Sequence, residues 1–199
     1  MSQILLLQSS LNGPASRTNQ LMKHFLQIRR EQGHQDQVVV RDLTALDLPA
    51  LDSPLFHSLR GAEPANEAIR QAVALSDRLI AELKAADLLL IGAPMYNLNV
   101  PTPLKNWFDL VARARVTFRY TDTYPMGLVE GVNALVFSSR GGVHQGQATD
   151  AVTPYLQSVL GLMGIAEVEF VYAEGMDLHP HGAEQGMREA HARIAGLGR

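Results

Sequence analysis

Short apolar runs alternate along the chain with longer segments in which apolar residues recur every three or four positions. The run at 88–91 contains only leucine and isoleucine, which is typical of a strand buried on both faces of a sheet. Pro94 has no backbone N–H to donate to a neighbouring strand, so this strand is expected to end before it. The predicted strands occupy residues 3–8, 38–40, 88–91, 132–137 and 168–172.

The segments between these runs have the spacing of amphipathic helices. Leu104, Trp107 and Phe108, for example, belong to one apolar stripe behind the third run. Residues 44–64 show no sustained period and are predicted to form a long loop. Residues 116–129 are predicted to be either a hairpin or a capping loop. The other predicted helices lie around 21–26, with a stop near Gly33, and at 67–86, 150–163 and 183–194.

Strands that alternate with helices favour a parallel, doubly wound sheet with right-handed crossovers. We therefore predict an α/β protein with a flavodoxin-like fold, in which a five-stranded parallel sheet has helices on both faces. The common strand order for such a sheet is 2-1-3-4-5. The 199 residues contain no linker and no internal repeat, so a single domain is predicted over residues 1–199.

Composition and charge narrow the class of protein. The net charge of −3 is too small to predict a nucleic-acid or membrane partner, and no apolar run is long enough to span a bilayer. The absence of cysteine excludes disulfides, thiolate metal sites and cysteine nucleophiles. No secretory signal is recognisable, so we expect a cytoplasmic protein.

Three loops that leave predicted strands are unusual in composition. They cover residues 9–19, 94–99 and 138–144, and they are rich in hydroxyl, proline and glycine residues. In an open α/β sheet, ligands bind beside the carboxyl ends of the strands. The exits of strands one, three and four are therefore expected to form one binding site.

The first of these loops suits a phosphate group. Ser10, Ser16 and Thr18 offer hydroxyls next to a helix start, whose free amides and dipole attract anions. Arg17 either adds positive charge or points into solvent. A serine that only caps the helix is the commoner explanation, and this loop taken alone favours it.

Several kinds of phosphate and nucleotide site are excluded because their residues are missing. The chain has neither the Gly-Lys-Ser/Thr of a Walker A loop nor a Gly-x-Gly-x-x-Gly turn after the first strand. It lacks the cysteine of a phosphatase, the acidic residues of a receiver domain and the Gly-x-Ser-x-Gly elbow of a hydrolase. Two further polar loops would flank a planar ring, which makes FMN the best candidate.

Seven segments, taken together, match the motifs of one known family in order and spacing. They are residues 9–10, 16–20, 93–97, 104–113, 116–120, 138–142 and 173–175. On these residues the chain resembles the FMN-dependent NADH azoreductases, which are also described as NADH:quinone oxidoreductases. The similarity covers nearly the whole chain.

The resemblance implies a homodimer with FMN at the dimer interface. It also implies that NADH gives a hydride to the FMN and that an azo compound or a quinone then takes the same slot and receives two electrons, which is a ping-pong mechanism. No side chain acts as a nucleophile in this scheme, so no catalytic residue is predicted. Carried over by position, the FMN-binding residues are Ser10, Ser16, Arg17, Thr18, Met95, Tyr96, Asn97, Leu98, Ser139, Arg140, Gly141 and Gly142.

Some positions leave alternatives open. Leu98 stands where phenylalanine is usual in the family, which puts the substrate range in question. Phe118 and Tyr120 either line the substrate slot, reaching the FMN of a partner subunit, or simply pack. His144 is a candidate to bind a substrate or supply a proton, but an exposed loop histidine without a role is the commoner case. The histidines of the tail segment 179–181 are too few to predict a metal site.

Two other functions remain as alternatives. One is a flavodoxin-type electron carrier that docks protein partners, although such carriers tend to be more acidic than a net charge of −3. The other is an FMN-binding module that has lost turnover.

Overall fold

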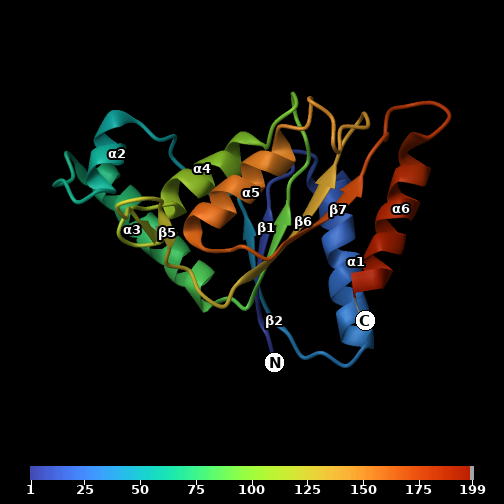
Figure 1. Ribbon diagram of the computed structural model, residues 1–199, viewed down its shortest axis with the longest axis horizontal. Helices are drawn as coiled ribbons and strands as arrows, with labels where there is room; N and C mark the ends of the chain where they lie inside the picture. Colours follow the sequence, from blue (N-terminus) through green and yellow to red (C-terminus); the bar gives the residue numbers. More distant parts are fainter. Residues whose placement is uncertain (198–199) are drawn as a thin grey trace.

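The structure of the protein is a computed structural model, and it describes residues 1–197. Its centre is a five-stranded sheet in which every neighbouring pair of strands is parallel. The strands are β1 (Gln3–Gln8), β2 (Gln37–Asp42), β3 (Leu88–Gly92), β6 (Asn133–Ser139) and β7 (Val168–Ala173). Their order, β2-β1-β3-β6-β7, is the predicted 2-1-3-4-5 order, and the flavodoxin-like fold class is confirmed (Figure 1).

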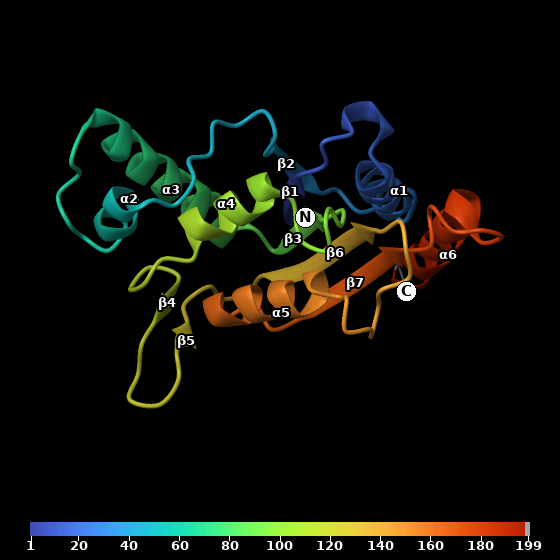
Figure 2. The same ribbon diagram turned by 90° about the horizontal axis from the view of Figure 1, so that it is seen from above.

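Helices cover both faces of the sheet. Successive side chains of a strand point to opposite faces, so the apolar strands present an apolar layer on each face. Leu89 and Ile91 of β3 belong to the apolar layer under three helices, whereas Leu90 belongs to the layer under two others. The first group is α3 (Glu67–Ala85), α4 (Thr102–Val111) and α5 (Val152–Met163). The second is α1 (Arg17–Glu31) and α6 (Gly182–Leu197), which lie side by side in Figures 1 and 2.

Local sequence fixes where several helices begin and end. The side chain of Ser16 accepts a hydrogen bond from the amide of Asn19 at the start of α1, and Asn66 does the same for Ile69 at the start of α3. Each bond satisfies an amide that has no partner within the first helical turn. α5 ends at Gly164, whose φ of 104° glycine adopts without a steric penalty.

The structure differs from the prediction in the segment 44–64, which was expected to be a loop throughout. It contains the short helix α2 (Ser53–Ser58), which Asp52 caps by accepting a hydrogen bond from the amide of Leu55. A six-residue helix is too short to display a helical period, and only Leu55 and Ser58 of its side chains are buried.

Residues 116–129 form a hairpin, which decides between the two predicted alternatives. Its strands are β4 (Phe118–Arg119) and β5 (Met126–Gly127), which pair in antiparallel fashion. The hairpin rests on the end of α5, where the amides of Leu128 and Val129 both donate to the carbonyl of Met163.

The two ends of the described chain lie at the same edge of the sheet. β1 begins and α6 ends at the amino edge, opposite the loops that leave β1, β3 and β6 (Figure 1). Within residues 1–197, no helix combines the length and the apolar character needed to cross a membrane.

Candidate functional site

The three unusual loops meet at the carboxyl edge of the sheet, as the sequence predicts. Together with the segment that follows β7, they surround a cavity of about 420 Å³. Six of the predicted FMN-binding residues are among those that line it: Arg17, Met95, Tyr96, Ser139, Arg140 and Gly141. The others lie in the same loops but outside the lining: Ser10, Ser16, Thr18, Asn97, Leu98 and Gly142.

The first loop leads into the start of α1, where two backbone amides have no hydrogen-bond partner among residues 1–197. After the short 3₁₀ helix η1 (Gly13–Ala15), Ser16 caps α1, and its buried hydroxyl lies 3.1 Å from that of Thr18. Ser16 therefore caps the helix, which is the commoner explanation that its sequence position favoured. The backbone amides of Arg17 and Thr18 have no hydrogen-bond partner among residues 1–197, and Arg17 lines the cavity. Free amides at a helix start and an adjacent guanidinium are suitable donors for a phosphate.

The second loop is tied to the first by the hydroxyl of Tyr96. This hydroxyl accepts a hydrogen bond from the amide of Leu11 at 3.1 Å and lies 3.2 Å from the hydroxyl of Ser10. Beyond it the chain turns back sharply, because Tyr96 and Asn99 exchange backbone hydrogen bonds of 2.9 and 3.0 Å. Leu98 lies at the tip of this turn and is 44% exposed.

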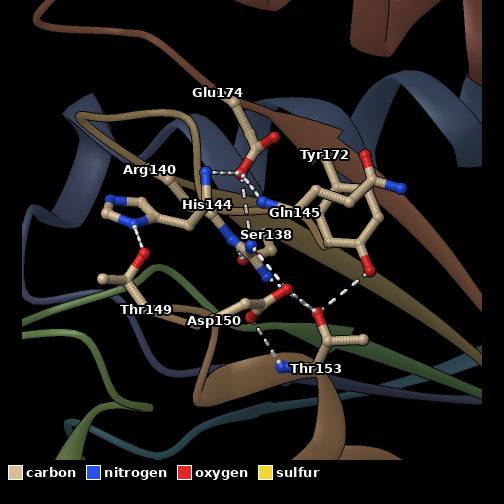
Figure 3. A network of polar contacts seen from close by, with 9 residues as sticks. All are labelled: Ser138, Arg140, His144, Gln145, Thr149, Asp150, Thr153, Tyr172 and Glu174. Carbon is tan, nitrogen blue, oxygen red and sulfur yellow. Dashed lines mark hydrogen bonds and ion pairs between the residues drawn. The ribbon is translucent and has the colours of Figure 1, made fainter. Parts of the chain in front are cut away.

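The third loop places the side chain of Arg140 differently from the expectation for a cofactor ligand. Only 1% of Arg140 is exposed, and its guanidinium lies in a network of polar side chains under the loop (Figure 3). It donates to Ser138 at 3.1 Å, Thr153 at 2.9 Å and Glu174 at 3.2 Å, and it pairs with Asp150 at 3.0 Å. The guanidinium of Arg140 is thus bound by other side chains of the protein. Only the backbone of Arg140 is left to contribute to the surface of the third loop.

The segment after β7 supplies lining residues that were not predicted. Met176 and Asp177 line the cavity, and the carboxylate of Asp177 would lie 2.4 Å from a Cβ atom added to Gly141. A larger residue at position 141 would therefore require the Asp177 side chain to move. The sequence signal for this fourth loop was Ala173-Glu174-Gly175, which directly follows the fifth strand and matches the resembling family.

The predicted substrate residues are not gathered at the cavity. Phe118 is buried and packs its ring edge-to-face on Tyr120, with 5.5 Å between the ring centroids, while Tyr120 is 68% exposed on the hairpin. Tyr120 lines a separate cavity of about 390 Å³ together with Arg60, Ala114, Arg115 and Arg119. The ring of His144 lies against Gly142, and its Nδ1 is 2.8 Å from the hydroxyl of Thr149.

The donors at the carboxyl-edge cavity fit FMN and do not fit a metal ion. Phosphate donors at the start of α1 and polar backbone from two further loops surround one cavity. In contrast, residues 1–197 contain no group of three or more His, Cys, Asp or Glu side chains that would hold a metal.

Residues 2–197 match the model of a family described as having a flavodoxin-like fold. The chain belongs to this family. Among the relatives of this flavodoxin-like protein is the FMN-dependent NADH:quinone oxidoreductase 4 of Burkholderia lata, which is 66% identical over 197 residues that cover 99% of both chains. The FMN-dependent NADH:quinone oxidoreductase of Aeromonas salmonicida is 52% identical over the same share of each chain.

A solved structure shows that the similarity also holds for the three-dimensional fold. The azoreductase of Bacillus anthracis strain Sterne superimposes on this flavodoxin-like protein with a TM-score of 0.86, at 28% identity over 100% of this chain and 99% of the other. The resemblance to FMN-dependent NADH azoreductases that the sequence motifs indicated is thereby confirmed.

Proposed function

We propose that the protein is an FMN-dependent oxidoreductase that takes electrons from NADH and reduces quinones and aromatic azo compounds. The observation that carries this proposal is the 66% identity, over 99% of both chains, to a protein named for NADH:quinone oxidoreduction. The cavity at the carboxyl edge supports it, because the loops that match the family's motifs surround that cavity.

We assign the parts of the cavity as follows. The amides of Arg17 and Thr18, with the side chains of Ser10 and Arg17, would hold the phosphate, and residues 95–98 and 139–142 would flank the ring. When bound there, FMN supplies two-electron transfer between a nicotinamide and an organic acceptor. Free backbone amides in residues 141–143 stabilise negative charge that develops beside them.

The donor and the acceptor are proposed to use one slot in turn. Such sharing gives ping-pong kinetics, in which NAD⁺ leaves before the quinone or azo compound binds. The chain has no cysteine, and this scheme requires no nucleophilic side chain. What the protein contributes is therefore the position and the electrostatic surroundings of the cofactor.

A homodimer would complete the slot. Tyr120 is exposed on the hairpin, and it lies away from the cavity of its own subunit. We propose that Phe118 and Tyr120 of one subunit reach the FMN of the other and that residues 1–199 act as one domain. Because NADH is an intracellular reductant, we propose that the enzyme works in the cytoplasm.

The proposal is tested by the visible spectrum of the purified protein loaded with FMN. Addition of NADH without oxygen should bleach the flavin absorbance, and a quinone or an azo dye should restore it. A flavin that binds and is not bleached by NADH would instead support an electron carrier. A protein that takes up no FMN would overturn the assignment of the loops, and a bound flavin that turns over no acceptor would support a silent module.

A further inference from the structure

One carboxylate holds the third loop at both of its ends. Glu174 Oε1 accepts three hydrogen bonds: from Arg140 Nη1 at 3.2 Å, from the amide of His144 at 2.8 Å and from the amide of Gln145 at 2.9 Å (Figure 3). The side chain of Glu174 is 12% exposed and that of Arg140 is fully buried. A single side chain, directly after β7, therefore binds residues on both sides of the segment 141–143.

The chain beyond Glu174 orients the peptide groups within that span. The carbonyls of residues 140, 141 and 142 accept hydrogen bonds from the amides of Met176, Asp177 and Gly175, respectively. The peptide bonds of the loop are trans, so each N–H points opposite to the preceding carbonyl. The amides of residues 141–143 are consequently turned away from the 175–177 segment, and they have no partner among residues 1–197.

The charges of the network allow an effect of Glu174 on the loop to be distinguished from an effect on overall stability. Arg140 faces two carboxylates, Glu174 and Asp150, so removal of either leaves the buried guanidinium paired. Burial alone would raise the pKa of Asp150, but hydrogen bonds from Thr153 and Arg140 outweigh it and lower that pKa. Asp150 accepts a hydrogen bond from the amide of Thr153 in the first turn of α5, whereas Glu174 binds backbone amides of the loop.

We infer that Glu174 is a positioning residue for the cofactor: it holds the amides of residues 141–143 where they serve as donors to the FMN ring. This inference rests on the proposed function. Glu174 acts through Arg140, His144 and Gln145 and does not line the cavity at the carboxyl edge. Without this carboxylate, the cofactor itself would have to order the loop, and binding would weaken.

The test compares Glu174→Ala with Asp150→Ala, a matched control that also removes one buried carboxylate from Arg140. Titration of apo-protein with FMN, followed by flavin fluorescence, should give a Kd raised about tenfold or more for Glu174→Ala, because up to three hydrogen bonds that order the loop are lost. The midpoint potential of the bound FMN should also fall. Asp150→Ala should change the Kd by less than about twofold, and Glu174→Gln, which keeps the acceptor oxygen, should restore most of the affinity.

A second readout does not depend on the cofactor. Hydrogen exchange in cofactor-free protein should lose protection at the amides of His144 and Gln145 in Glu174→Ala and retain it in Asp150→Ala. If Glu174→Ala does not fold, Glu174→Asp replaces it, because the shorter side chain keeps the charge and withdraws the oxygen from the loop. Its Kd for FMN should rise several-fold.

Two results would overturn the inference. One is FMN affinity and exchange protection in a folded Glu174 variant equal to those of the wild type. The other is equal weakening in the Glu174 and Asp150 variants, which would make the network a matter of general stability. Failure of the wild-type protein to bind FMN is a different outcome, since it would refute the proposed function itself.

Discussion

At the scale of single residues, the tip of the second loop combines two left-handed residues. Asn97 and Leu98 have φ angles of 50° and 65°, and both are needed for the chain to reverse between Tyr96 and Asn99. Asparagine tolerates this conformation, whereas leucine adopts it rarely because its Cβ approaches the backbone. At 44% exposure, the Leu98 side chain offsets little of this strain by packing.

We therefore expect Leu98→Gly to stabilise the protein by about 0.5 kcal/mol, since relief of the strain exceeds the extra entropy of glycine in the unfolded chain. Urea unfolding measures the change. Leu98→Ala is the control, because alanine keeps the Cβ and the strain and should give no gain. A glycine variant that is less stable than the alanine variant would show that the conformation costs leucine nothing.

The hydroxyl of Tyr96 joins two loops of the site, and its loss should be felt in cofactor affinity. Tyr96→Phe removes the acceptor of the Leu11 amide and the contact with Ser10, a change of about 1 kcal/mol. We expect the Kd for FMN to rise about fivefold in a fluorescence titration. Tyr124→Phe, at an 80% exposed position of the hairpin, should leave the Kd unchanged, and equal effects of the two variants would argue against the link.

Sequence predicted which loops surround the cavity better than it predicted where each side chain points. The position of Arg140 follows from a motif, but the direction of its side chain depends on Asp150 and Glu174, which are 10 and 34 residues away along the chain. Asp177 was missed for the same reason, because its contact with Gly141 exists only after β6 and β7 have paired.

At the scale of elements, two glycines seat the hairpin on α5. A Cβ atom at Gly127 would lie 2.1 Å from the backbone nitrogen of Gly164, and backbone atoms cannot yield as a flexible side chain does. The hairpin is thus held by close backbone packing in addition to the hydrogen bonds to Met163.

Gly127→Ala should destabilise the protein by about 2 kcal/mol or more, because the hairpin would have to lift from the helix end. Gly161→Ala serves as the control within α5, where an added Cβ meets nothing within 4 Å. It should raise stability by about 0.5–1 kcal/mol through helix propensity. Thermal or urea unfolding compares the two, and a neutral Gly127→Ala would contradict the seating of the hairpin.

Elements with a long periodic pattern were predictable, and short or exposed ones were less so. The helix expected at 67–86 is observed at Glu67–Ala85, because several of its turns repeat the same apolar face. α2 was missed because its six residues bury only Leu55 and Ser58. β2 was predicted, yet its three valines are 37–48% exposed, since an edge strand is covered less than a central one.

At the scale of the whole molecule, two histidines meet where α1 packs against α6. The rings of His24 and His191 lie 4.5 Å apart between centroids. Burial, followed by the charge of His24, lowers the pKa of His191 below its ordinary value of 6.5. The folded protein therefore prefers His191 neutral, and the unfolded chain takes up the proton at a higher pH.

The stability of the protein should consequently fall as the pH drops from about 6.5 toward the lower folded pKa of His191, because the unfolded state binds more protons in that window. His191→Gln should reduce this loss. Urea unfolding at about pH 7.5 and 5.5 gives the difference for each protein. An identical pH dependence in wild type and variant would show that His191 does not contribute.

Both ends of the described chain lie at the edge of the sheet opposite the cavity. A purification tag, a fused partner enzyme or a tether to an electrode attached at either end would stand on the far side of the sheet from the loops that surround the cavity. The fold is thus suited to immobilisation, and attachment through its ends leaves the mouth of the cavity facing the surrounding solution.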